Sequence, residues 1–145
     1  MGYDIKTIED AILAALKAEP LLTSAKTIDT YHGEIEDFIQ QIPQLTIPLP
    51  AVLVHYTGSV YEAVSIEEYD ETPTFTLILI AQDRRGKAKL RTGIYDLLTA
   101  CKSILRGNNL GLQIGKLKPV RTYIITTTKT ISAYGFDLST YFADA

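Results

Sequence analysis

Hydrophobic residues recur at intervals of three and four positions in three segments of the chain. These segments are residues 7–17, 34–42 and 89–105. Such spacing places the apolar side chains on one face of a helix, so we predict three amphipathic helices. The third is the longest and most regular, and its apolar face consists of Leu90, Ile94, Leu97, Leu98, Cys101, Ile104 and Leu105. Gly107, just beyond this face, is typical of the end of a helix.

Five other segments have the composition of β-strands, and they are residues 25–31, 51–56, 74–81, 120–128 and 130–142. The second and third are almost continuously apolar, which indicates strands that are covered on both faces or central in a sheet. In the last segment small and polar residues alternate with large apolar ones, so one face should belong to the core and the other should be polar. Pro43, Pro48 and Pro50 predict an extended connector before the strand at 51–56.

Residues 57–73 separate the two most apolar strands and differ from both in composition. Gly58 is a turn signal, and four acidic residues lie near the end of the segment, namely Glu67, Glu68, Asp70 and Glu71. Their spacing lacks the alternation and the turn glycine of a calcium-binding loop, and an acidic run is usually a solvated loop. We therefore predict a projecting hairpin or loop around residues 57–73.

The predicted elements favour an α+β fold. A chain of 145 residues, 46% of them hydrophobic, is long enough to form one compact domain over residues 1–145. In this domain two or three helices should pack on one largely antiparallel sheet. No apolar run approaches the roughly 20 residues of a membrane span, and the first residues lack the pattern of a signal peptide. We expect a soluble protein that is made in the cytoplasm and has no contact with a membrane.

Charge is distributed unevenly along the chain. Residues 1–83 carry 14 acidic and 3 basic side chains, whereas residues 84–145 carry 3 acidic and 11 basic ones. Five of the basic residues fall within residues 82–91, and these are Arg84, Arg85, Lys87, Lys89 and Arg91. Such asymmetry suits a nucleic-acid surface or a head-to-tail contact between the acidic surface of one subunit and the basic surface of the next. The basic stretch has no aromatic residues for base stacking, which favours the subunit contact.

No catalytic, metal-binding or cofactor motif is present. Gly86-Lys87 lacks both the earlier glycine and the following hydroxyl residue of a phosphate-binding loop. His32 and His55 are the only histidines, and neither has a His, Cys or acidic residue at metal-ligand spacing. Cys101 is the only cysteine and lies on the predicted apolar face of a helix, where it acts as a small hydrophobic residue. We expect neither an enzyme nor a bound cofactor or metal.

The order of elements and several segments resemble a known group of phage proteins. These segments are the helix IEDAILAALKA, the short TIDTYHGEIEDF segment, the strand PAVLVHYTG, the strand-to-helix unit at residues 74–105 and the closing strand AYGFDLSTYF. Over nearly the whole chain they resemble the small Mu-like phage tail proteins that are related to tail terminators.

The resemblance implies a structural role. Tail terminators are similar α/β proteins that form hexameric rings on the end of the tail tube, stop its polymerisation and provide the surface that joins the head connector. The implied partners are further copies of the chain in a hexamer, the tail tube protein and the head–tail connector protein, and the implied location is the virion tail. DNA passes through the ring, so contact with DNA would be non-specific at most. The resemblance supplies no catalytic residues.

By analogy with that ring, we expect two charged segments to contact neighbouring subunits or the tube. The acidic one is Glu67, Glu68, Asp70 and Glu71, and the basic one is Arg84, Arg85, Lys87, Lys89 and Arg91. A heterologous ring needs two different, complementary surfaces, which this asymmetry would provide. Three alternatives remain open at this point: another oligomeric neck or tail assembly module without catalytic activity, an oligomeric module of non-viral origin, and an enzyme or nucleic-acid binder.

Overall fold

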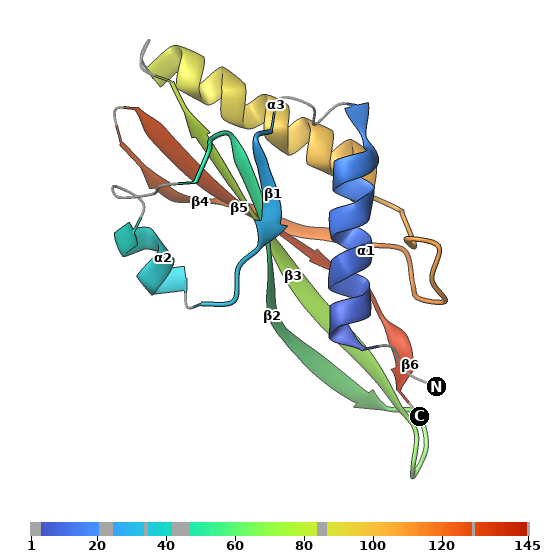
Figure 1. Cartoon of the computed structure of the whole chain (residues 1–145). Coiled ribbons are helices and arrows are strands. Elements are labelled where there is room, and N and C mark those ends of the chain that lie inside the picture. The colour runs from blue at the N-terminus through green and yellow to red at the C-terminus, as the bar shows by residue number, and fades with distance from the viewer. Residues whose placement is uncertain are drawn as a thin grey trace.

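The computed structural model describes residues 4–20, 25–33, 35–41, 47–83, 87–128 and 130–144, and within them the chain forms helices on a single sheet (Figure 1). The sheet has the strand order β1-β2-β3-β5-β4, and β6 also pairs with β3. The elements are α1 (Ile5–Ala18), β1 (Thr27–Thr30), α2 (Ile35–Gln41), β2 (Ala51–Ala63), β3 (Tyr69–Gln82), α3 (Lys87–Leu105), β4 (Lys118–Thr127), β5 (Ile131–Ser139) and β6 (Phe142–Asp144).

The predicted α+β class is confirmed. All strand pairs among the described residues are antiparallel except the pair of β1 with β2, which is parallel. The central strand is β3, whose neighbours are β2 on one side and β5 and β6 on the other. The segments predicted as strands all contain strands, and the segment at 130–142 contributes both β5 and the start of β6.

Helix α1 shows why the sequence pattern was informative. The Asp4 side chain caps the helix by accepting a hydrogen bond from the Lys6 backbone N–H at 2.9 Å. Ile8, Ile12 and Leu16 follow at intervals of four and are completely buried. These side chains therefore hold α1 on the sheet, because they form one apolar stripe along the face of the helix.

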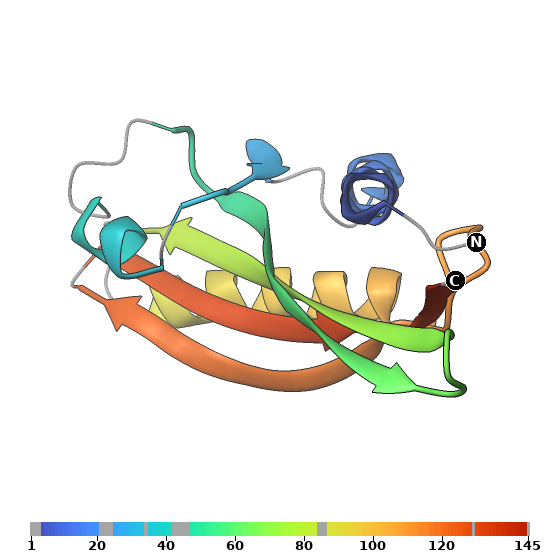
Figure 2. The ribbon, with the colours of Figure 1, turned by 90° about the horizontal axis from the view of Figure 1, so that it is seen from below.

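The two faces of the sheet are covered to different extents. On one face, α1 and α3 enclose the main core, in which β3 contributes Phe75, Leu77 and Leu79. On the other face, Phe38 of α2 packs on a smaller cluster made of Ala51, Leu53, Ile78, Ile80 and Ala133. Helix α1 lies to one side of β1 and α2 to the other, as both views show (Figures 1 and 2). Strand β3 is thus buried on both faces at this end, as its apolar run predicted.

Strand β5 follows its predicted alternation of core and polar faces only in part. Phe136 and Leu138 belong to the main core, as expected. On the face expected to be polar, however, Ala133 is completely buried and Asp137 is only 7% exposed. The reason is that the α2 cluster covers Ala133 and that neighbouring side chains of β3 and β4 surround Asp137.

The turn predicted at Gly58 is wrong. Strand β2 continues through this residue to Ala63, and Gly58 lies at a β-bulge where the pairing with β3 shifts. Its φ angle of 133° is one that side-chain-bearing residues rarely adopt, which explains the glycine. The chain reverses instead at residues 64–68, where the Val64 backbone N–H donates to the Glu68 carbonyl.

Helix α3 ends close to the predicted position. Ile94, Cys101 and Leu105 are completely buried, and Gly107 follows with a φ angle of 74°. Burial raises the pKa of the Cys101 thiol to about 12, so this thiol stays protonated and serves as a small core residue. No helix within the described residues is long and apolar enough to cross a membrane.

Candidate functional site

The paired ends of β2 and β3 form an arm, which we define as residues 58–74. Cross-strand pairs run from Gly58 and Thr74 to Ala63 and Tyr69, and the loop 64–68 closes the tip. The arm extends past the end of α1, and the short strand β6 lies beside it (Figures 1 and 2). Because the described helices do not reach its tip, side chains there face solvent in the isolated chain.

The arm concentrates exposed apolar side chains. Of the large apolar residues that are exposed in the described part of the chain, more than half lie on it, namely Val60, Tyr61, Val64, Ile66 and Tyr69. Ile66, in the loop at the tip, is 96% exposed. Val60 shares the face of Glu62 and Asp70, Tyr61 and Tyr69 lie on the opposite face, and Val64 and Ile66 lie at the tip. Such a concentration of exposed apolar residues on one projecting hairpin is typical of a contact site. The arm therefore has the composition of an interaction surface.

The predicted acidic contact residues all lie on the arm, but they are not equivalent. Glu67 and Glu68 are exposed in the tip loop, and Asp70 is half-buried in β3. Glu71 is only 5% exposed, and it accepts a hydrogen bond from the Ser59 hydroxyl at 2.6 Å. Since Ser59 gives its single proton to Glu71, the Tyr56 hydroxyl must donate to Ser59. Glu71 thus stabilises the base of the arm rather than its surface.

A carboxylate that the sequence pattern did not single out faces Asp70. Glu62 of β2 and Asp70 of β3 are direct cross-strand partners on the same face of the arm. No ion pair joins either carboxylate to a cation in the described part of the chain. Like charges directly opposite one another destabilise a strand pair, and a cationic partner would offset this cost. Glu62 lies in the same acidic segment of the sequence, so it could have been noticed there. Only the strand register shows that Asp70 is its partner.

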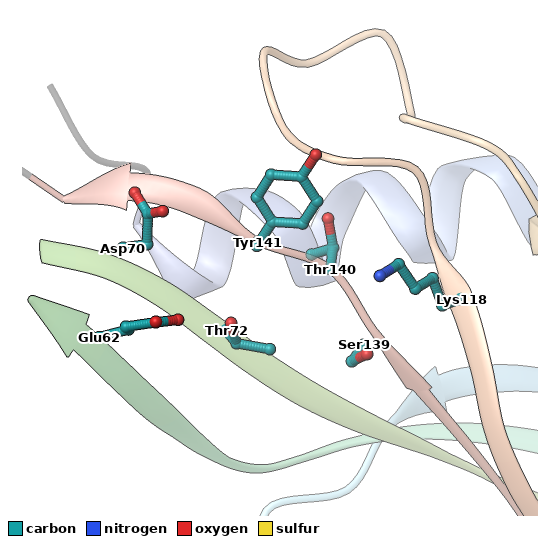
Figure 3. Close-up of a pocket in the computed structure, with 7 residues that line it drawn as sticks. All are labelled: Glu62, Asp70, Thr72, Lys118, Ser139, Thr140 and Tyr141. Atoms are coloured by element: carbon teal, nitrogen blue, oxygen red, sulfur yellow. The ribbon is translucent and has the colours of Figure 1, made fainter. Parts of the chain in front are cut away.

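These two acids form one wall of a cleft of about 230 Å³ at the base of the arm (Figure 3). Lys118 of β4 lies on the opposite side, and its ammonium group is 5.9 Å from the centre of the Tyr141 ring. The remaining lining is formed by Thr72, Ser139 and Thr140. The cleft is polar and open, and it brings together β2, β3, β4 and the segment between β5 and β6.

A third carboxylate on this face, Asp137, has its partners within the chain. Asp137 accepts hydrogen bonds from the Thr76 hydroxyl at 2.6 Å, from Arg121 Nε at 2.9 Å and from the Tyr123 hydroxyl at 3.2 Å. The Arg121 guanidinium also stacks over the Tyr123 ring at 4.4 Å. Burial raises the pKa of Tyr123, which keeps the phenol protonated as a donor. This cluster ties β4 to β5 and β3, and it was not predicted.

Strand β5 makes room for this cluster with a glycine. A Cβ atom on Gly135 would overlap the Tyr123 ring. The ring therefore occupies the space that a side chain at this position would need. A carboxylate that accepts hydrogen bonds from three side chains of its own chain has a structural role.

The predicted basic segment is described only in part. Arg84 and Arg85 lie outside the described residues, and for Lys87, Lys89 and Arg91 the structure describes the backbone, which forms the start of α3. A different basic surface is visible on β4, an edge strand preceded by Lys116 and containing Lys118 and Arg121. Val120 and Ile124 of the same strand are 57% and 61% exposed.

The two histidines have structural partners. His55 Nδ1 lies 2.9 Å from the Tyr31 carbonyl, and its ring packs against the Tyr31 ring. His32 Nε2 lies 3.8 Å from a carboxylate oxygen of Glu9, which is buried in α1. Burial raises the pKa of Glu9. Among the described residues, no three metal-ligating side chains come together.

Comparison with known proteins places this chain among phage proteins. A profile of the family described as "Bacteriophage Mu, Gp37" matches residues 4–143. The chain belongs to the phage Mu Gp37 family. The resemblance to Mu-like phage proteins that the sequence suggested is thus confirmed.

The Mu Gp37 family fold also occurs in a solved particle. A chain of the structure described as "Virion of native gene transfer agent (GTA) particle" superimposes with a TM-score of 0.65. The superposition covers 99% of this chain and 100% of that one, at 14% sequence identity. At this identity the likeness shows a shared fold. A search of curated protein sequences gave no match.

Proposed function

We propose that this protein is a tail terminator, or tail completion protein, of a phage or prophage. In this role it forms a ring that caps the tail tube and provides the surface that joins the head. The family match over residues 4–143 carries the proposal, because it links nearly the whole chain to a Mu-type phage. The fold shared with a chain of a virion particle supports a place in the virion, and the virion tail is the place proposed.

The arm supports an assembly role. An exposed group of apolar side chains beside uncompensated carboxylates is costly unless a partner covers it. A ring whose subunits meet head to tail requires two different surfaces on each subunit. We propose that Glu67, Glu68 and Asp70 contribute to one such contact, and that the basic segment from Arg84 to Arg91 contributes to a subunit or tube contact.

We propose no catalytic activity and no cofactor. Both histidines lie beside side-chain or backbone oxygens of the same chain, and the Asp137 carboxylate accepts hydrogen bonds from three side chains. The proposed partners are copies of the chain, with a hexamer as the expected ring, the tail tube protein and the head–tail connector protein. DNA would pass through the ring with non-specific contact at most, and synthesis would take place in the cytoplasm of the bacterial host.

A second candidate is another neck or tail assembly module without catalytic activity. It is favoured by the comparison with the solved particle, whose description specifies a virion but no part of a tail. Both candidates predict an oligomer, and they differ in what the oligomer binds.

The mass of the purified protein at low and high salt tests the oligomer, and binding to purified tail tubes tests the terminator. We expect a closed assembly of uniform mass that attaches to tube ends only. A protein that stays monomeric at high concentration and does not bind tubes would contradict the proposal. Binding along the length of the tube, or to connectors alone, would favour the second candidate.

A further inference from the structure

Strand β4 has the features of a receiving surface. It lies at the edge of the sheet and, within the described residues, pairs only with β5. Residues 116–128 include Lys116, Lys118 and Arg121 and no acidic residue. Val120, between Lys118 and Arg121, exposes more than half of its side chain, whereas the equally exposed Ile124 lies on the opposite face of the sheet from Lys118. An edge strand that combines basic and apolar side chains is suited to an acidic, apolar partner.

The arm has the complementary features. Residues 58–74 contain five acidic residues and no basic one. Val64 and Ile66 are exposed at its tip, next to Glu67 and Glu68. Charge and apolar character therefore occur together on both surfaces, with opposite sign of charge.

The tip of the arm cannot reach the outer edge of β4 in the same chain, although the base of the arm shares a cleft with Lys118. In the sheet, β3 and β5 lie between β2 and β4, so the free edges of β2 and β4 face opposite directions. A contact between these two surfaces therefore joins two copies of the chain. Because the surfaces differ, the contact is head to tail and can continue around a ring.

The sequence of β4 favours contact through side chains over a continuous strand ladder. The pairing of β4 with β5 shifts at two places, between Pro119 and Arg121 and between Ile124 and Thr126. Bulges and proline interrupt the regular row of hydrogen-bonding groups that another strand would need. The first bulge leaves Val120 without a partner residue on β5, which makes it available to a neighbour.

We infer that the tip of the arm, residues 64–68, docks on β4 of a second copy of the chain. Val64 and Ile66 cover Val120, and Glu67 and Glu68 face Lys116 and Lys118. This contact is one of those within the proposed ring, and to that extent it rests on the proposed function. In this contact the basic residues belong to β4 and its preceding loop. The basic segment around Arg84 would then contact a different surface.

Engineered disulfides test the contact directly. Cys101 is completely buried, so new surface cysteines are the reactive ones. We expect the variant that carries both Ile66→Cys and Val120→Cys to form, on mild oxidation, covalent ladders longer than a dimer on a denaturing gel. Each single variant serves as a control and can give a dimer at most.

A ladder that stops at the dimer would show a reciprocal two-fold contact and would overturn the head-to-tail inference. If the double variant gives no cross-link although its mass in solution is that of an assembly, the arm does not dock on β4, while the proposed ring survives. If the unmodified protein is monomeric under all conditions, the proposed function fails together with the inference. The three results are therefore distinguishable.

A charge exchange provides an independent test. We expect Glu67→Lys with Glu68→Lys, and separately Lys116→Glu with Lys118→Glu, each to weaken assembly by about tenfold or more at low salt. Combining all four changes should restore assembly, and circular dichroism should show the same fold throughout, since all four residues are exposed. Loss of assembly in the combined variant as severe as in the two separate ones would contradict direct pairing.

For the apolar part, Ile66→Ser should weaken assembly roughly tenfold or more, because a largely exposed isoleucine becomes buried in the contact. The matched control is Ile66→Leu, which keeps the apolar area. Equal assembly by Ile66→Ser and the unmodified protein would mean that the tip contacts something other than a second copy, such as the tube protein.

Discussion

Two sets of carboxylates on one face of the sheet have opposite environments. Asp137 is surrounded by Thr76, Arg121 and Tyr123, and each donates a hydrogen bond to it. Glu62 and Asp70 face each other on the arm, and no described cation pairs with either. The first arrangement completes the fold of the single chain, whereas we propose that a partner completes the second. On this proposal, the difference separates the part of the molecule that stabilises the fold from the part that takes part in assembly.

The largest effect should follow from breaking the internal set. Asp137→Ala leaves the buried Thr76 hydroxyl and the Tyr123 hydroxyl without their acceptor, and we expect a loss of about 3 kcal/mol in the free energy of unfolding. Urea denaturation measures this loss. Asp137→Asn keeps one oxygen acceptor and should lose clearly less. A change below about 0.5 kcal/mol for Asp137→Ala would contradict the assigned role, because that is the range of ordinary surface substitutions.

Glu9 of α1 is a carboxylate that is only 6% exposed, and its nearest ionisable partner among the described residues is His32 at 3.8 Å. The pKa of Glu9 is raised by burial, so the folded chain binds the proton more tightly than the unfolded chain does. The contribution of this group to stability is therefore largest below the unfolded pKa and is lost as pH rises through the folded pKa. We expect Glu9→Gln to stabilise the protein by less than about 1 kcal/mol at pH 7 and to have no effect near pH 3.

Thermal unfolding of both proteins across this pH range measures the difference. A variant that is less stable than the unmodified protein at neutral pH would show that His32, at 3.8 Å, compensates the buried charge fully. His32→Ala is the control, since it should remove whatever compensation the imidazole provides.

The smallest effect on stability is expected on the arm. Glu62→Gln removes the like-charge repulsion with Asp70, so the isolated chain should gain roughly 0.2–0.5 kcal/mol. The same change should weaken assembly, because it removes a charge that a cationic partner would neutralise. Stability and assembly would thus change in opposite directions, which a structural carboxylate such as Asp137 cannot show. Urea denaturation at low protein concentration and mass at high concentration give the two values.

The sequence was sufficient for features that depend on neighbours along the chain. Helical periodicity located α1 and α3, and the apolar run located the central strand, because both depend on which residues are buried every few positions. Gly58 was misread because its neighbours along the chain do not show how the strands pair. A glycine with positive φ suits a turn or a bulge equally well, and only the strand pairing tells them apart.

Features that depend on register could not be predicted. The Asp137 cluster joins residues that are 61, 16 and 14 positions apart along the chain. The opposition of Glu62 and Asp70 depends on where the hairpin turns, which the sequence misplaced. Glu71 looked like a member of an exposed acidic run, but the alternation of β3 directs it inward to Ser59, whereas Asp70 points to the other face.

The most direct test of the terminator proposal is electron microscopy of particles made by the phage or prophage when it lacks this protein. The proposal predicts abnormally long tail tubes or tails that never join heads, and the unmodified gene supplied in trans should restore normal particles. Tails of normal length that are attached to heads in the absence of the protein would contradict it.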